Sequence, residues 1–171
     1  MAARFKPIGR VTMILIDRLN ELIADIQMCM LVSVHANGQL HSRPMATQAV
    51  SDDGFLWFFT SAHSSKADEI RNNREVNVAY SDLTNMRFVS VAGTCELVRN
   101  RPTSERLWRD EYKRWFPMGL DDPELILLKV TINAVEYWDV QANRMRELTA
   151  INETVQLRDD RTVATDDRSV A

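Results

Sequence analysis

The sequence predicts a mainly β protein, in which an antiparallel sheet of about six strands closes into a small barrel with helices at its periphery. Apolar, β-branched segments of strand length recur along the chain, and most of them are joined by turn sequences and not by helices. The 171 residues are 45% hydrophobic and 26% charged, which supplies one core but leaves no room for two ordinary domains. We therefore expect a single barrel with a short appendage.

Composition and charge restrict the class of partner. The formal net charge is −3 and the pI is near 5.6, so we expect no nucleic-acid or membrane-surface binding. No stretch approaches the roughly 20 apolar residues of a membrane span, and no signal peptide is visible, so we expect a soluble, cytoplasmic protein. A local basic pocket for a small anion is compatible with this composition.

Cysteine and histidine give no sign of a metal or redox centre. Cys29 and Cys95 lie far apart and form no CxxC pair, which is typical of two buried thiols. His35, His41 and His63 are the only imidazoles, and none has a second histidine or cysteine at metal-ligand spacing. We expect no metal site.

The first element is expected to be an amphipathic helix over residues 12–27. Thr12 is a plausible N-cap, and polar residues separate apolar side chains that recur at spacings of four and three: Leu15, Leu19, Leu22 and Ile26. One face of this helix should pack on the core.

Three strands are expected next. Residues 28–34 and 40–50 flank Asn37-Gly38, a pair that predicts a tight hairpin turn with two residues at positive φ. A second turn at residues 51–54 leads to an aromatic strand over residues 55–60. We expect these strands to run as a meander, so that the second and third strands are hydrogen-bonded neighbours.

A short helix should follow the third strand. Ser65 and Asp68 have the spacing of a capping box, which predicts a helix that runs through Arg71. Alternating apolar residues predict strands over 75–81 and 88–98, and Gly93 indicates a bulge or a close approach of two backbones.

The last part of the barrel is expected to be a helix and a long strand. The helix should begin at Pro102 and end at Gly119, and the strand should cover residues 125–140. We therefore assign residues 1–140 to the barrel domain. Residues 141–171 form a C-terminal extension, with a short helix around Leu148 and Ile151 and then a polar tail that has little to bury.

Two cations and two hydroxyls form the most specific candidate site. If the second and third strands are neighbours, Arg43 meets the start of the helix that carries Ser64, Ser65 and Lys66. A helix N-terminus, serine hydroxyls, a planar guanidinium and an ammonium together suit a phosphate monoester. The plainer interpretation, in which Ser65 only caps the helix and both cations are solvated, stays open.

Apolar residues near this site suggest a place for a flat ring and for a second subunit. Pro44 and Met45 follow Arg43 on the same strand, where proline favours an edge and methionine adapts to a ligand. Trp108, Trp115 and Trp138 add more rigid aromatic surface than a small barrel buries easily. We expect a homodimer.

Several motifs in order resemble the general stress protein 26 family, which belongs to the pyridoxamine 5'-phosphate oxidase-like FMN-binding proteins. They are Ser-Arg-Pro-Met at 42–45, Leu-Trp-Phe-Phe-Thr-Ser at 56–61, Ser-Ser-Lys at 64–66, Trp-Phe-Pro-x-Gly at 115–119 and Glu-Tyr-Trp-Asp at 136–139. This resemblance runs from about residue 23 to residue 139. It implies a six-stranded antiparallel split β-barrel.

The resemblance also implies a homodimer with two flavin sites at the subunit interface. Arg43 and Lys66 match the family's phosphate-binding cations, with Ser64 and Ser65 beside them. Pro44 and Met45 match the strand along the isoalloxazine ring, and a neighbouring strand end supplies Phe59, Thr60 and Ser61. The partner's wall would come from among Trp108, Trp115 and Trp138. The implied cofactor is FMN, with FAD as the alternative.

The resemblance implies a flavin-dependent oxidoreductase acting on an unknown small substrate, and it leaves alternatives open. The chain has no histidine after His63 and so lacks the C-terminal Arg-x-His segment of true pyridoxamine 5'-phosphate oxidases, which argues against that activity. A non-catalytic flavin-binding, storage or stress-sensing protein is the first alternative. A deazaflavin-dependent reductase and a dimeric adaptor are the others.

Overall fold

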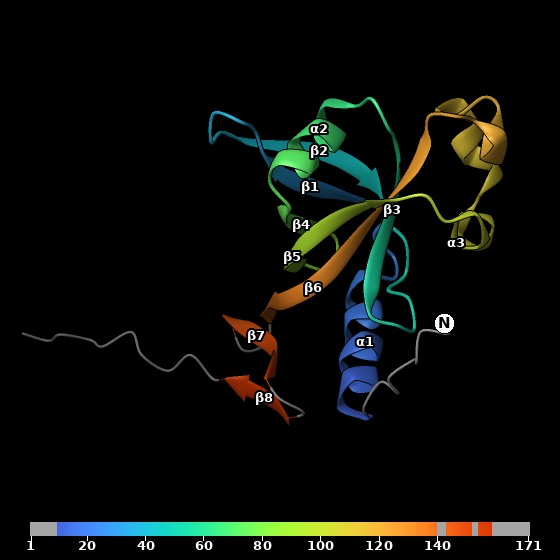
Figure 1. Cartoon of the computed structure of the whole chain (residues 1–171). Coiled ribbons are helices and arrows are strands. Elements are labelled where there is room, and N and C mark those ends of the chain that lie inside the picture. Colours follow the sequence, from blue (N-terminus) through green and yellow to red (C-terminus); the bar gives the residue numbers. More distant parts are fainter. Residues whose placement is uncertain (1–9, 140–142, 152–153, 159–171) are drawn as a thin grey trace, which may run out of the picture.

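The computed structural model describes residues 10–139, 143–151 and 154–158, and it contains eight strands and three α-helices in these ranges (Figure 1). The six predicted strands are all present, and two further strands extend the sheet. The elements, in chain order, are α1 (Arg10–Ile23), β1 (Met28–Val34), β2 (Leu40–Ala46), β3 (Phe55–Ser61), α2 (Ser65–Asn72), β4 (Glu75–Asp82), β5 (Arg87–Val98), α3 (Arg101–Leu107), η1 (Asp110–Arg114), η2 (Gly119–Asp121), β6 (Leu125–Asp139), β7 (Arg144–Ile151) and β8 (Thr154–Arg158).

All strand pairs are antiparallel, and the order across the sheet is β2-β1-β4-β5-β6-β7-β8. The third strand, β3, lies off this path and pairs with β6. The expected meander is therefore wrong at its third strand. The reason is burial: consecutive residues of β3 such as Leu56, Trp57 and Phe58 are buried, and β6 offers the equally buried Leu127 and Leu128 as neighbours.

The longest strand, β6, pairs with three other strands and so links β3 to the rest of the sheet. Its first half pairs with β3, its last residues pair with β7, and β5 runs along most of its length. The register between β5 and β6 shifts at Gly93, where a Cβ atom would overlap the carbonyl oxygen of Thr131. The bulge and close backbone approach predicted at this glycine are thus confirmed.

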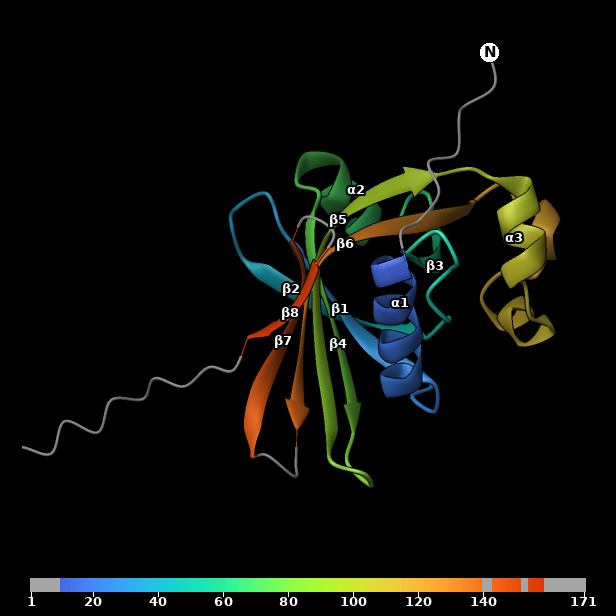
Figure 2. The ribbon, with the colours of Figure 1, turned by 90° about the horizontal axis from the view of Figure 1, so that it is seen from below.

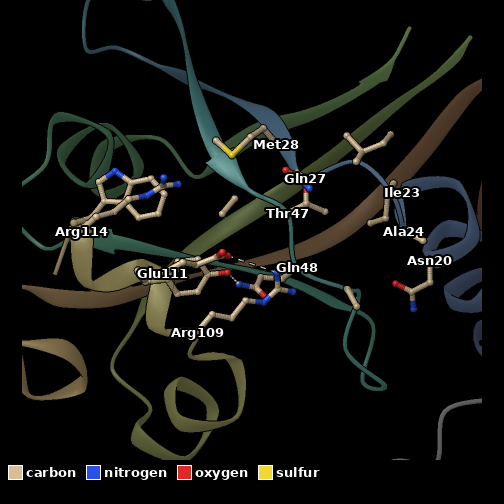
Figure 3. Close-up of a pocket in the computed structure, with 15 residues that line it drawn as sticks. Asn20, Ile23, Ala24, Gln27, Met28, Thr47, Gln48, Arg109, Glu111 and Arg114 are labelled. Atoms are coloured by element: carbon tan, nitrogen blue, oxygen red, sulfur yellow. Dashed lines mark hydrogen bonds and ion pairs between the residues drawn. The ribbon is translucent and has the colours of Figure 1, made fainter. Parts of the chain in front are cut away.

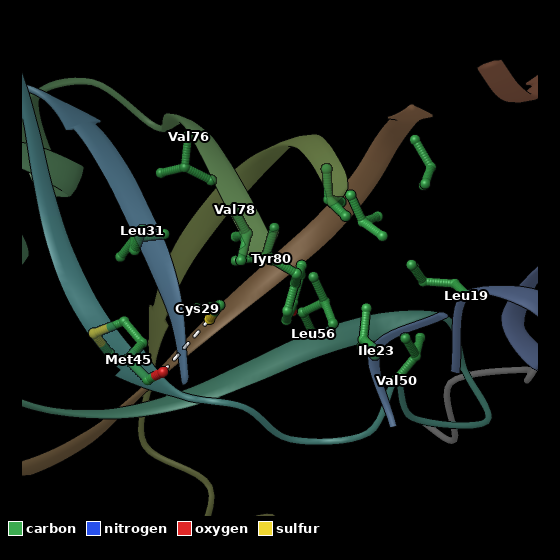
Figure 4. Packing of buried hydrophobic residues seen from close by; sticks show 14 of the residues in the cluster. Leu19, Ile23, Cys29, Leu31, Met45, Val50, Leu56, Val76, Val78 and Tyr80 are labelled. Atoms are coloured by element: carbon green, nitrogen blue, oxygen red, sulfur yellow. Dashed lines mark hydrogen bonds between the residues drawn. The ribbon is translucent and has the colours of Figure 1, made fainter. Parts of the chain in front are cut away.

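The core fills the space between the curved sheet and α1. Figure 4 shows Leu19 and Ile23 of α1 facing side chains from the strands, among them Leu56 and Tyr80. The helix ends at Ile23, four residues before the predicted end. Ile26 still reaches the core from the following turn, which is why the apolar pattern continued past the helix.

The β1–β2 turn differs from the expected one. Only Gly38 has a positive φ, at 85°, and the bond from the His35 amide to the Gln39 carbonyl encloses three loop residues. This is a three-residue hairpin loop with glycine at the left-handed position, so the two-residue turn predicted from Asn37-Gly38 is wrong.

The helix predicted from Pro102 to Gly119 is also shorter in the structure. α3 ends at Leu107 because Trp108 has an extended backbone, and two short 3-10 turns follow. This segment projects to one side of the sheet, between the end of β5 and the start of β6 (Figures 1 and 2).

The short helix predicted around Leu148 and Ile151 is wrong, since these residues lie in β7. Leu148 pairs with Val135 of β6 and is 6% exposed, so the sheet itself buries this leucine. β7 and β8 continue the sheet past the expected boundary at residue 140 (Figure 2). The polar tail predicted after residue 158 lies outside the described residues.

Among the described residues, no helix has the length and hydropathy needed to span a membrane.

Candidate ligand-binding site

A pocket of about 300 Å³, here called the α2 pocket, lies where β2 and β3 end beside the start of α2 and the turn η1. It brings together eight of the residues predicted from the sequence: Pro44, Met45, Phe59, Thr60, Ser61, Ser64, Lys66 and Trp115. The remaining walls are Met28, Ala46, Gln48, Tyr112 and Phe116, none of which was predicted. The structure therefore assembles most of the predicted site although two of its strands are not paired as expected.

Four predicted residues do not line this pocket. Arg43 and Ser65 lie beside it, on β2 and at the start of α2. Trp108 lies behind Phe59, with the two ring centroids 5.7 Å apart. Trp138 pairs with Met145 of β7, near the opposite end of β6 from the strand start that faces Ser61.

The start of α2 is capped by Ser64 and not by Ser65. The Ser64 hydroxyl accepts a hydrogen bond from the Ala67 amide at 3.4 Å and donates to the Ser61 carbonyl at 2.8 Å. The Thr60 and Ser64 hydroxyls are 3.1 Å apart. This network fixes the end of β3 to the first turn of α2, so the pocket has a rigid polar corner.

Lys66 is the cation of the pocket itself. Its side chain is half-buried, and no carboxylate of the described residues forms an ion pair with it. Burial lowers the pKa of Lys66, the positive charge of Arg43 lowers it further, and Glu69 acts in the opposite direction. A bound anion would stabilise the charged form of this half-buried ammonium group.

Arg43, by contrast, is already paired. Its two terminal nitrogens, Nη1 and Nη2, donate to the two carboxylate oxygens of Glu69 at 2.8 Å each. Glu69 is 3% exposed and also accepts from the Ser33 hydroxyl at 2.6 Å, and it lies 2.7 Å from Nδ1 of His41. Arg43 reaches Ser65 at 3.4 Å.

The charge of Glu69 is strongly stabilised by this cluster. The hydrogen bonds from Arg43 are the largest cause that lowers the pKa of Glu69 to about 2, and Ser33 and His41 contribute in the same direction. Sequence reasoning missed Glu69, Ser33 and His41 as neighbours of the site. The available signal was a glutamate beside Ile70 on the buried face of a short helix.

Aromatic rings form the opposite wall. Tyr112 lies within 6.1 Å, between ring centroids, of Phe59, Trp108 and Trp115. Its hydroxyl accepts a hydrogen bond of 2.5 Å from the side-chain amide of Gln48, and both residues are buried. Burial raises the pKa of Tyr112, so the phenol stays protonated.

A second pocket of about 420 Å³ adjoins the first one. It lies between the end of α1, the segment after β2 and the turn η1 (Figure 3). The two pockets share five wall residues, namely Met28, Ala46, Gln48, Tyr112 and Trp115. We call this second cavity the Arg114 pocket, after an arginine that lines it.

Comparison with known proteins places this chain in a family. The model of the family described as "Pyridoxamine 5'-phosphate oxidase like" matches residues 15–158, and the chain belongs to this family. General stress protein 26 of Bacillus subtilis is 32% identical over 101 residues, which are 54% of this chain and 66% of that protein. Protein bli-3 of Neurospora crassa is 28% identical over 109 residues, 58% of this chain and 52% of that protein.

The matched segment thus spans about half of bli-3 and just under two thirds of general stress protein 26. Among solved structures, the general stress FMN/FAD binding protein of Xanthomonas citri superposes with a TM-score of 0.61 at 26% identity, covering 80% of this chain and 94% of that chain. The family resemblance and the mainly β fold class predicted from the sequence are confirmed.

Proposed function

We propose that this chain binds a flavin, FMN in preference to FAD, in the α2 pocket and acts as a flavin-dependent oxidoreductase on a small substrate. The observation that carries the proposal is Lys66, a half-buried cation without a carboxylate partner among the described residues, in a pocket with flat apolar walls. The name of the Xanthomonas citri relative, which states FMN/FAD binding, supports the same cofactor class.

The residues of the pocket fit such a cofactor. Lys66 and the amides at the start of α2 form a site for a phosphate. Met45, Phe59 and Trp115 offer flat or adaptable apolar surface for a planar ring system. The volume of about 300 Å³ lies at the lower end of the roughly 300–1,000 Å³ of ligand pockets.

A bound flavin would supply the hydride chemistry, and the chain would supply position and surroundings. Lys66 would hold the phosphate end, and the Ser64 hydroxyl, which donates to the Ser61 carbonyl, would keep the start of α2 in place. The buried Gln48–Tyr112 pair lies at the other end of the pocket and presents polar groups there. Trp108 packs behind Phe59 and supports this part of the ring wall.

We also propose that the protein is a homodimer with the pocket at its interface. On the sheet face turned away from the core, Pro44, Met30, Ala79 and Ser90 form an uncharged row across β2, β1, β4 and β5. Met28, Met30 and Leu40 on the same face expose 44%, 40% and 70% of their surface. Met28 and Pro44 also line the pocket, so the pocket opens at the edge of this face.

A non-catalytic flavin carrier is the second candidate. Among the described residues that line the α2 pocket, Lys66 and Tyr112 are the only ones with side chains that titrate, and no histidine or carboxylate lies there as an acid or base. A carrier predicts that NADH and NADPH reduce bound flavin no faster than free flavin, whereas a nucleotide-dependent reductase predicts a clear acceleration.

Titration of the flavin-free protein with FMN, with riboflavin in parallel, tests the proposal. We expect FMN to bind and riboflavin, which lacks the phosphate, to bind at least about tenfold more weakly. Binding of neither ligand would overturn the flavin assignment. Equal binding of both would overturn the placement of the phosphate at Lys66.

A further inference from the structure

The Arg114 pocket carries cations in a cavity larger than the α2 pocket. Two arginines line it, Arg109 and Arg114, together with one carboxylate, Glu111. Figure 3 shows Arg109 and Glu111 extending toward Gln48 on one wall, with Met28 on another. The charged side chains of this cavity thus sum to one positive charge.

Arg114 is the cation that is available to a ligand. Its guanidinium lies 3.8 Å above the ring of Trp115, which orients the group and leaves its N–H edge free. The neighbouring carboxylates have other partners, since Asp110 pairs with Lys113 at 3.1 Å and Glu111 with Arg109 at 3.9 Å. A stacked guanidinium with a free edge is well suited to a planar or tetrahedral anion.

The position of the cavity relative to the α2 pocket is informative. The shared wall comes from the starts of β1 and the segment after β2 and from η1, and includes Gln48, Tyr112 and Trp115. Neither Lys66 nor Ser64 belongs to it. The Arg114 pocket therefore adjoins a part of the α2 pocket that is formed without Lys66 and Ser64.

We infer that the Arg114 pocket binds a small organic anion beside the ring of the bound flavin, with Arg114 holding the anionic group and Trp115 as the adjoining wall. This inference rests on the proposed function, because the anion would be the substrate class of the proposed flavin-dependent oxidoreductase. The binding of the anion itself depends only on the residues of the Arg114 pocket.

The test is calorimetric titration of the full chain with benzoate, benzamide and phenyl phosphate, each with and without FMN. Benzamide has the shape of benzoate without its charge, and phenyl phosphate separates phosphate from carboxylate recognition. The variants are Arg114→Gln and, as a control, Arg106→Gln. Arg106 is an exposed arginine of α3, loses the same charge and does not line the pocket.

We expect at least one of the two anions to bind, and Arg114→Gln to weaken that binding about tenfold or more, since a charge-assisted contact is lost. Arg106→Gln should leave anion affinity within about twofold, because exposed charges outside the pocket are screened. FMN affinity should be the same in both variants.

The inference fails if neither anion binds, if benzamide binds as well as benzoate and phenyl phosphate, or if the two variants weaken anion binding equally. Failure of the flavin proposal has a different signature: FMN does not bind, while the anion still binds and depends on Arg114. Flavin absorbance that shifts on anion addition in the FMN-loaded wild type, but not in Arg114→Gln, would support the placement beside the ring.

Discussion

The two cations predicted to hold a phosphate occupy opposite electrostatic situations, although they lie at the same end of α2. Arg43 gives both terminal nitrogens to the buried carboxylate of Glu69. Lys66 has no carboxylate partner among the described residues, and burial and Arg43 lower its pKa. The charge of Arg43 is thus neutralised within the fold, whereas Lys66 is available to the anionic ligand that we propose.

One short helix thus carries both the buried ion pair and the cation of the proposed binding site. The buried side of α2 carries Glu69, which ties the helix to Arg43 of β2 and Ser33 of β1. The pocket side carries Lys66 and the Ser64 cap. Arg43 also lowers the pKa of Lys66, so the Arg43–Glu69 pair and Lys66 are electrostatically coupled.

The largest expected effect comes from breaking the Arg43–Glu69 ion pair. Arg43→Met leaves the carboxylate of Glu69, which is 3% exposed, without its main partner, and should lower the free energy of unfolding by about 3 to 5 kcal/mol. Urea denaturation measures this. The double variant Arg43→Met/Glu69→Met should recover part of the loss, because no unpaired charge is left buried.

Arg18→Met is the control, since Arg18 pairs with Glu21 on the surface and both are about half exposed or more. It should cost less than about 1 kcal/mol. If Arg43→Met is no more destabilising than this control, the Arg43–Glu69 pair does not stabilise the fold.

A second prediction concerns acid. The pKa of Glu69 is about 2 in the fold, against an ordinary value of 4.5, so its charge stabilises the protein above about pH 4.5. That stabilisation, about 3 kcal/mol, is lost as the pH falls from about 4.5 toward 2. Unfolding free energies at several acidic pH values should therefore fall more steeply in the wild type than in Glu69→Gln. Identical slopes would show that Glu69 is not the group responsible.

The third prediction concerns Lys66, the cation that we propose binds the phosphate of the ligand. Lys66→Met should weaken FMN binding about tenfold, leave riboflavin binding nearly unchanged, and change stability little, because Lys66 has no ion pair to lose among the described residues. Fluorescence titration of both flavins measures this. Equal weakening of FMN and riboflavin would mean that Lys66 contacts the ring and not the phosphate.

The smallest expected effect separates the two serines at the start of α2. Ser64→Ala removes the helix cap and its bond to the Ser61 carbonyl, and should cost about 1 kcal/mol in unfolding free energy. Ser65→Ala loses only a 3.4 Å contact with Arg43 and should cost a few tenths of that. A larger loss of unfolding free energy in Ser65→Ala than in Ser64→Ala would show that Ser65, and not Ser64, caps the helix.

Local patterns were sufficient for much of the fold. Strand-length segments, the glycine at 93 and the residues at the start of α2 carry their information within a few positions. The six strands were therefore identified correctly, and eight of the twelve candidate site residues line one pocket. Predictions were wrong where the spacing of apolar residues fitted both a helix and a strand. The apolar residues around Leu148 fit either a helix or a strand, and only pairing with Val135 makes them a strand.

The sequence by itself determined the class of fold and the family, because residue types and their spacing encode hydrophobic faces, turns and helix starts. Tertiary structure decided which strand lies beside β3, that Arg43 belongs to Glu69, and that Gln48 meets Tyr112 across 64 positions of the chain. These outcomes depend on which groups are buried together, and burial decides whether a charge is left free for a ligand or must be neutralised within the fold.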